Sequence, residues 1–251
     1  MRIAVLMTCH NRKETTLCCL RELMPQLGVE DRVFLVDDGS TDGTGEEVKR
    51  MFECSNVLNG RVIKGNGNLF WAKGMRLAWE TAVKEGDWDA YLWLNDDTQL
   101  EVSAIARLRK VGGEGNVAVG GLIDSSGAKV YGLCEDGIFS GNVVFVPRRV
   151  YEEVGMICGC YHHAWADVDY ALHCKQAGIG VVEVEAVGKA KGHPFRPDPT
   201  GCSFRERVSM LLDPKGWCIH DVWVYRRRNF GLIAAMVSCI HLVFHVLMGV
   251  R

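Results

Sequence analysis

Pairs of carboxylates at the ends of apolar runs are the residues of this sequence best suited to chemistry. Asp37 and Asp38 follow one such run, and Asp96 and Asp97 follow another. Adjacent carboxylates at the tip of a buried strand repel each other, so we expect a ligand or a cation to offset the repulsion. Carboxylate oxygens are ligands that Mg²⁺ or Mn²⁺ takes when it also holds substrate phosphates. Each pair also suits the capping of a turn or helix, but their occurrence together favours a site.

A further acidic segment surrounds Asp167 and Asp169, which we predict to lie in the first turn of a helix. The helix dipole stabilises acidic residues at that position, so a structural role is one interpretation. An aspartate held at a helix start and directed into a cleft also serves well as a general base. The segment is therefore a second candidate for chemistry, separate from the metal ligands.

Apolar runs typical of buried strands alternate along the chain with amphipathic stretches typical of helices. This alternation predicts an α/β fold, a Rossmann-like, doubly wound and mostly parallel sheet covered on both faces. Such sheets bind ligands at the carboxyl ends of their strands, where the polar clusters lie. The predicted strands are Ile3–Met7, Arg32–Val36, Asn59–Lys64, Ala90–Leu94, Val117–Ile123, Gly141–Pro147 and Gly180–Val187. The predicted helices are Thr15–Gln26, Thr44–Phe52, Leu69–Glu85, Val102–Lys110 and Val168–Ala177.

Composition places the chain among globular proteins. Of its 251 residues, 48% are hydrophobic and 24% are charged, which is enough apolar material for a packed core. The 29 basic and 31 acidic residues give a net charge of −2, so no overall field attracts nucleic acid. The 11 cysteines lack paired spacing and the chain opens on no secretory signal, so we expect free thiols in a reducing compartment, not disulfides.

The C-terminal segment Phe230–Val250 contains no Asp, Glu, Lys or Arg and follows three arginines. As a helix it would be about 31 Å long, close to the hydrocarbon thickness of a bilayer. His241 and His245 fall on one face, which favours a helix lying on a membrane surface over one that spans it. A helix packed on protein is the alternative. The predicted domains are a catalytic domain, 1–228, with halves 1–99 and 100–228, and the apolar helix, 229–251.

Five segments in this order resemble family 2 glycosyltransferases with the A-type nucleotide-sugar fold. They are residues 8–12, 36–44, 65–75, 94–98 and 165–173. The resemblance extends over roughly residues 1–228. The version Asn68-Leu69-Phe70-Trp71, together with Tyr225–Phe230, is similar to the rhamnosyltransferase-like branch, which builds bacterial surface polysaccharides.

The resemblance implies that a nucleotide is held mainly by the first half of the chain. The implied nucleotide-binding residues are Thr8, Asn11, Arg12, Asp37, Asp38, Asn68, Trp71, Asn95 and Asp96. Asp97 would ligate Mg²⁺ or Mn²⁺, and His193 would add a ring nitrogen to the same ion. Asn95 departs from the family's Asp-x-Asp motif, so a second metal carboxylate would come from Asp96 or another group.

The resemblance also implies inverting transfer of a sugar, with Asp167 in the place of the general base. Ala166 stands where the family has a glutamate. The donor would be a dTDP- or UDP-sugar, and the acceptor a saccharide or a polyprenyl-linked saccharide, at the cytoplasmic face of the membrane. One alternative is a non-catalytic nucleotide-sugar-binding protein. Another is a sugar nucleotidyltransferase, which predicts a glycine-rich loop where this chain has residues 8–12 without glycine.

Overall fold

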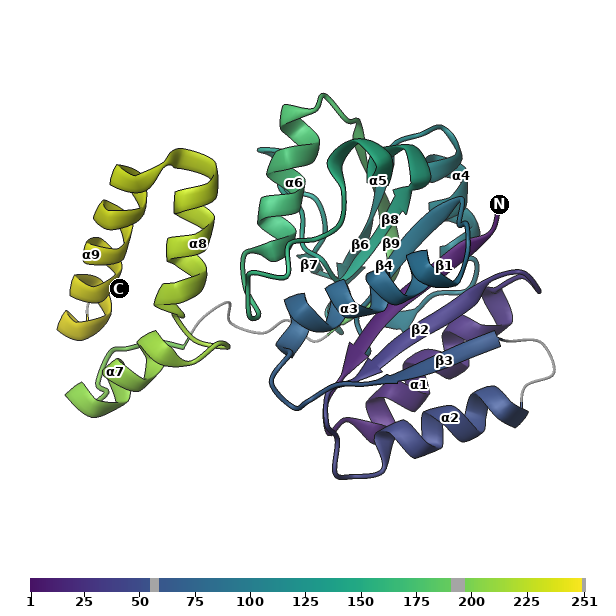
Figure 1. Cartoon of the computed structure of the whole chain (residues 1–251), viewed down its shortest axis with the longest axis horizontal. Helices are drawn as coiled ribbons and strands as arrows, with labels where there is room; N and C mark the ends of the chain where they lie inside the picture. The colour runs from purple at the N-terminus through teal and green to yellow at the C-terminus, as the bar shows by residue number, and fades with distance from the viewer. Residues whose placement is uncertain (55–58, 191–196, 250–251) are drawn as a thin grey trace.

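The computed structural model describes residues 1–54, 59–190 and 197–249. Within them a mixed sheet runs in the order β3-β2-β1-β4-β8-β6-β9-β5, with β7 paired to β6 (Figure 1). Strands β3, β2, β1 and β4 are parallel to one another, as are β6 and β9, whereas β8, β5 and β7 pair antiparallel with their neighbours. This is the α/β fold predicted from the sequence. The strands are β1 Ile3–Cys9, β2 Arg32–Asp37, β3 Asn59–Lys64, β4 Ala90–Leu94, β5 Gln99–Leu100, β6 Val117–Ile123, β7 Lys129–Tyr131, β8 Val143–Pro147 and β9 Val181–Lys189. The α-helices are α1 Lys13–Leu23, α2 Thr44–Cys54, α3 Phe70–Glu85, α4 Ala104–Gly113, α5 Arg148–Val154, α6 Ala166–Gln176, α7 Phe204–Leu212, α8 Ile219–Phe230 and α9 Leu232–Met248.

The sheet topology brings the loops that carry the polar clusters to one edge. Strand β1 pairs in parallel with both β2 and β4, so the three carboxyl ends lie side by side. Strand β8 then runs antiparallel to β4 and enters the sheet from that same edge. The segment just before β8 therefore joins the loops that follow β1, β2 and β4.

Helices cover both faces of the sheet because successive strand residues point to opposite sides. In β1, Ile3, Val5 and Met7 belong to one core together with side chains of α1, α2 and α4. Ala4 and Leu6 belong to the other core, which α3, α5 and α6 complete. All five side chains are fully buried, as expected for a strand in the middle of such a sheet.

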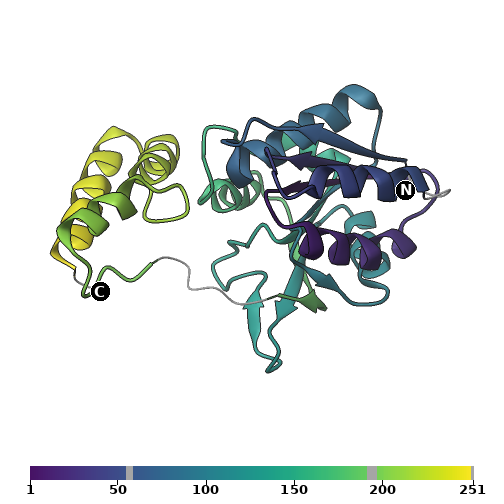
Figure 2. The ribbon, with the colours of Figure 1, turned by 90° about the horizontal axis from the view of Figure 1, so that it is seen from below.

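Helices α7, α8 and α9 form a C-terminal helical unit that lies to one side of the sheet and its covering helices (Figures 1 and 2). The unit has its own small core of Leu211, Val222, Leu242 and Val246. Helix α9, which lies within the predicted segment 229–251, thus packs on α7 and α8. The predicted division of the chain at residues 228 and 229 stays a prediction.

The predicted helix Phe230–Val250 is wrong at its start. Helix α8 ends at Phe230 and Gly231 follows with φ +91°, a left-handed conformation that a glycine adopts at little cost. The chain reverses there, and α9 begins only at Leu232. Among the helices of the described residues, none is both long and apolar enough to cross a bilayer.

The expectation of free thiols fails for one pair of cysteines. Cys158 and Cys160 form a disulfide in the loop between α5 and α6. Because the two cysteines are only two positions apart, the turn of the loop brings their sulfur atoms together. The spacing of the cysteines along the sequence does not by itself reveal such a pair. The nine other cysteines are free thiols.

Candidate active site

Trp71, in the first turn of α3, links the segments that meet at the carboxyl edge of the sheet. Its indole Nε1 donates a hydrogen bond to Asn95 Oδ1 over 2.8 Å, which ties α3 to the loop after β4. Gly141 lies against the indole ring so closely that a Cβ atom would overlap it. The Gly141 amide in turn donates to Asp167 Oδ2 over 2.8 Å. The nucleotide-binding candidates and the candidate base therefore lie on either side of one tryptophan.

Asp38 is nearly buried, with 5% of its surface exposed. Its Oδ1 accepts a hydrogen bond from the Gly67 amide at 2.8 Å, and its Oδ2 accepts from the Leu69 and Phe70 amides at 2.9 and 3.0 Å. Three backbone donors therefore stabilise the carboxylate. They give Asp38 a role in fixing the loop that leads into α3, while the expected contact of Asp37 and Asp38 with a ligand or cation stays a prediction.

The loops after β1 and β2 are joined by side chains of the predicted nucleotide site. Asn11 Oδ1 accepts from the Thr41 amide at 2.7 Å, and the Asn11 amide donates to Ser40 Oγ at 2.9 Å. Asp37 Oδ1 accepts from the Ser40 amide at 3.0 Å. Thr8 lies near the carboxyl end of β1 and contacts α3. These residues converge as predicted in position, while their contact with a nucleotide stays a prediction.

Arg12 reaches across to the loop after β4. Its Nη1 lies 2.8 Å from Asp96 Oδ1 and 3.1 Å from Asp97 Oδ2. Asp96 also accepts from Thr16 Oγ1 at 3.0 Å and is 4% exposed. Burial raises the pKa of Asp96, although the Arg12 guanidinium partly opposes that rise. Asp96 is thus committed to protein contacts, and it shapes the site through Arg12.

Asp97 is the accessible carboxylate of the loop after β4, because 29% of its side chain remains exposed. One carboxylate with substrate phosphates and waters is a usual ligand set for Mg²⁺, so Asp97 fits the implied divalent ion. Asn95 contributes less to such an ion, since its Oδ1 already accepts from Trp71. His193 lies outside the described residues.

Asn68 is an exposed residue of the loop that Asp38 holds in place. Its backbone amide donates to Asn66 Oδ1 at 2.9 Å, and the residue is exposed to solvent. The loop conformation depends on Gly67, whose φ is +84°. Asn68 therefore borders the site without being fixed by it.

Asp167 lies in the first turn of α6, half-buried. Burial raises its pKa above the ordinary value of 3.8, although hydrogen bonds from the Gly141 and Val168 amides oppose the rise. A carboxylate with a raised pKa accepts a proton more readily, as a general base must. The geometry thus suits Asp167 to the predicted role, and that role stays a prediction.

Helix α8 holds the segment around Asp167 from the other side. Asn229 Nδ2 donates to Asp169 Oδ1 at 2.6 Å, and Arg228 forms an ion pair with Asp169 over 3.4 Å. The Tyr225 ring stacks on Trp165 with ring centroids 4.6 Å apart. These contacts are not predictable from the sequence, because their partners lie more than 50 residues apart along the chain.

A cavity of about 510 Å³ lies on the outer side of α3, next to the loop that precedes α6. Lys73, Arg76, Glu80 and Arg228 line it together with apolar side chains. It is separate from the carboxyl edge, because Asp38, Asp97 and Asp167 do not line it. The candidate active site is therefore defined by converging side chains and not by this cavity.

A mixed sheet with polar and acidic side chains at the carboxyl ends of its parallel strands is typical of α/β proteins that bind ligands at that edge. The profile described as Glycosyl transferase family 2 matches residues 4–135, more than half of the chain. The chain belongs to that family. A search of curated proteins finds no significant match.

Solved structures of glycosyltransferases share the fold. The mannosyltransferase PcManGT from Pyrobaculum calidifontis, in complex with GDP-Man and Mn²⁺, is 16% identical with a TM-score of 0.64, covering 98% of this chain and 69% of that one. TarS 1-349 from S. aureus is 14% identical with a TM-score of 0.62, covering 98% and 81%. Its complex with UDP-GlcNAc is 13% identical with a TM-score of 0.60, covering 98% and 82%.

Proposed function

We propose that the protein is a metal-dependent, inverting glycosyltransferase that moves a sugar from a nucleotide diphosphate donor to an acceptor hydroxyl. The observation that carries the proposal is the position of Asp167 across Trp71 from the loop that bears Asp97. A base and a metal ligand on either side of one ring suit a reaction that joins two substrates. Family membership and the nucleotide sugars bound by two similar structures support it.

On this proposal the donor lies over the carboxyl ends of β1, β2 and β4. Thr8, Asn11, Arg12 and Asp37 line the loops that would hold its base and ribose. Asp97 would hold Mg²⁺ or Mn²⁺, which when bound neutralises charge on the diphosphate leaving group. Asp38 and Asp96 act indirectly, since their oxygens bind backbone amides and neighbouring side chains.

The acceptor would bind on the Asp167 side of Trp71. As the acceptor oxygen attacks the anomeric carbon, its proton passes to a carboxylate oxygen of Asp167. Attack on the face opposite the departing diphosphate inverts the configuration in one displacement. The Gly141 and Val168 amides keep the carboxylate in place during the transfer.

The acceptor we propose is a saccharide, carried on a polyprenyl lipid, in the synthesis of surface polysaccharide, and the donor sugar is rhamnose on dTDP or UDP. The likeness of residues 68–71 to the rhamnosyltransferase-like branch supports the sugar. The exposed apolar face of α9 supports contact with a membrane surface, where such a lipid would be found. Its exposed residues are Ile233, Met236, Val237, Ile240, Phe244 and Met248. On this proposal α9, within the predicted segment 229–251, attaches the protein to the membrane surface, and the residues before it carry out the reaction.

Replacing Asp167 by asparagine tests the proposal. We expect Asp167→Asn to lower kcat at least about 100-fold, because the amide cannot accept the proton. The rise in Tm caused by the donor, screened among dTDP-, UDP- and GDP-sugars with Mn²⁺, should be unchanged. In the wild type, kcat should fall as the pH drops through a pKa above 3.8, since the protonated carboxyl is no longer a base.

Asp124→Asn, in an exposed turn, is the control and should leave kcat unchanged. Normal turnover by Asp167→Asn would refute the role of the base. A wild-type protein that binds nucleotide sugars without turnover would instead favour the non-catalytic alternative. Release of pyrophosphate from a nucleoside triphosphate would favour the nucleotidyltransferase.

A further inference from the structure

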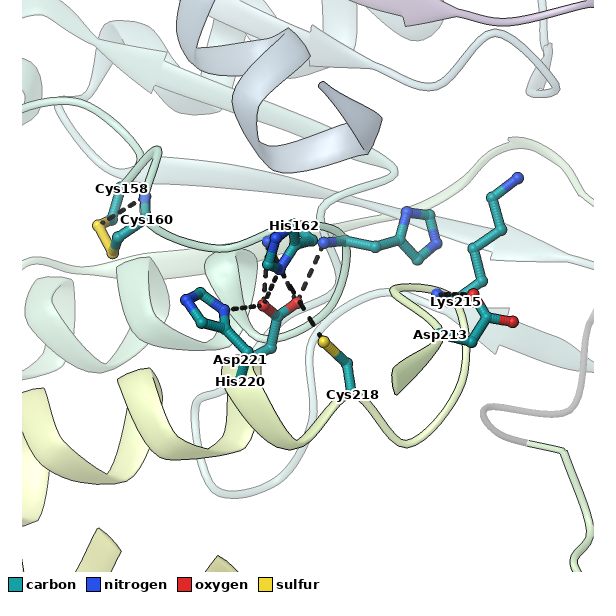
Figure 3. Close-up of polar contacts among 9 residues, drawn as sticks. Cys158, Cys160, His162, Asp213, Lys215, Cys218, His220 and Asp221 are labelled. Carbon is teal, nitrogen blue, oxygen red and sulfur yellow. Dashed lines mark hydrogen bonds and ion pairs between the residues drawn. A yellow bond between two sulfur atoms is a disulfide. The ribbon is translucent and has the colours of Figure 1, made fainter. Parts of the chain in front are cut away.

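Asp221, in the first turn of α8, is a fully buried carboxylate at the junction between the C-terminal helical unit and the loop before α6. Its Oδ1 lies 2.9 Å from His162 Nδ1 and 3.0 Å from His220 Nδ1. Its Oδ2 accepts hydrogen bonds from the His162 and His163 amides at 3.2 and 3.1 Å. Figure 3 shows both imidazole rings turned toward this one carboxylate.

The charge of Asp221 needs a positive partner, because a carboxylate without solvent is costly to keep ionised. Burial disfavours its ionised form, and hydrogen bonds from both imidazoles and from the His162 and His163 amides compensate for that burial. Within the described part of the chain, the ion pairs of Asp221 involve only these two histidines. A cation shared by the three side chains would meet the same need.

We propose that His162, His220 and Asp221 bind a zinc-like divalent transition-metal ion that joins α8 to the loop leading to Asp167. The three ligand atoms lie within 4.8 Å of one another. Zinc with bonds of about 2.0–2.3 Å spaces its tetrahedral ligand atoms by roughly 3.3–3.7 Å, so small movements would open room for the ion. Divalent transition metals bind a set of two imidazoles and one carboxylate more strongly than Mg²⁺ does.

Cys218 lies outside the cluster of three ligand atoms, and on this proposal a shift of its side chain would make it a fourth ligand. Its Sγ lies 3.9 Å from His162 Nδ1, and the side chain is 4% exposed (Figure 3). The thiolate form of a cysteine is a strong zinc ligand, and coordination removes its proton. The neighbouring Cys158 and Cys160 are bonded to each other and do not contribute. Three ligands thus come from the beginning of α8 and one from the loop.

This metal would be distinct from an ion on Asp97. His162 also accepts, through its backbone oxygen, a hydrogen bond from the Ala72 amide at 3.1 Å, so the loop contacts α3 beside Trp71. A metal at His162 would stiffen the connection between α8, this loop and the site. The inference concerns the junction itself and does not depend on the proposed transfer reaction.

Metal content of the full chain, purified without a histidine tag, tests the proposal. After loading with zinc and gel filtration, we expect the wild type to retain about one ion per chain. Cobalt in place of zinc should give the intense visible bands of tetrahedral Co²⁺ and, with Cys218 bound, a thiolate charge-transfer band. Removal by a chelator should lower Tm.

His220→Gln is the main variant, because 49% of that side chain is exposed and the fold should tolerate the change. We expect it to weaken zinc binding at least about tenfold. His163→Gln, an exposed neighbour, and Asp97→Asn should bind zinc as the wild type does. Retention of less than about half an ion per chain by the wild type would overturn the proposal. The cluster would then be held together by hydrogen bonds from the two imidazoles to the Asp221 carboxylate, without a metal. Equal binding by His220→Gln and the wild type would also overturn it.

Discussion

The two sides of the candidate site are held in place by different means. On the nucleotide side, the loops after β1, β2 and β4 meet because their strands are neighbours, and Asp38 fixes the loop before α3 through backbone amides. On the side of Asp167, the flanking residues Trp165 and Asp169 are held by α8, which follows in sequence by more than 50 residues. One side is therefore a property of the sheet, whereas the other depends on the C-terminal helical unit.

On the nucleotide side, the fold should depend more on the buried carboxylate Asp38 than on the accessible carboxylate Asp97. Asp38→Ala removes the acceptor of three backbone amides. We expect the free energy of unfolding to fall by about 3 kcal/mol, because buried donors are left without partners. Urea denaturation measures the change. Asp97→Ala, at the accessible carboxylate, is the control and should cost less than about 1 kcal/mol; equal losses would contradict the comparison.

Loss of a contact on the side of Asp167 should lower kcat more than it weakens donor binding. Asn229→Ala removes the 2.6 Å hydrogen bond to Asp169 and loosens α6 beside the base. A loss of about 1.4 kcal/mol in positioning corresponds to a kcat roughly tenfold lower. Steady-state kinetics with the donor varied measures both parameters.

The neighbouring variant Arg227→Ala, at an exposed position of α8, should leave kcat unchanged. If Asn229→Ala instead weakened donor binding at constant kcat, α8 would belong with the nucleotide side. The comparison between the two sides would then fail.

The exposed face of α9 should matter least to the fold. Ile240→Asp is expected to change the free energy of unfolding by no more than about 0.5 kcal/mol, since the side chain is 68% exposed. It should nevertheless lower binding to anionic phospholipid vesicles, measured by co-sedimentation, because burial of that face drives the attachment. Val102→Asp, equally polar but 87% exposed on another surface, should bind like the wild type. Equal binding by both variants would remove the membrane proposal.

Strands and loops of the nucleotide side were predictable because their signals are local. The runs Asn59–Lys64, Ala90–Leu94 and Val117–Ile123 match observed strands at both ends. A buried strand between two helical layers must be continuously apolar, so the limits of Ala90–Leu94 and Val117–Ile123 show in the sequence. Once these strands are placed in parallel, the topology brings the polar residues after them to the same edge of the sheet.

The contacts of single carboxylates were not predictable, because they depend on residues distant in sequence. Asp38 resembles a ligand for a substrate, yet its oxygens bind the amides of residues 67–70. Asp221 resembles an ordinary acidic residue at a helix start, and only the folded chain brings His162 to it. The end of α8 differs from the prediction for a local reason. Gly231 adopts a left-handed conformation and ends the helix, although the residues that follow it are apolar.

Trp165 has φ +72°, a left-handed conformation that costs a non-glycine residue about 1–2 kcal/mol. Its stacking on Tyr225 offsets that cost, and it immediately precedes the helix that carries Asp167. During synthesis on the ribosome, Trp165 emerges well before Tyr225 does. We therefore expect the nascent chain to gain nucleotide binding first and to become able to react with acceptors only once its last helices have folded.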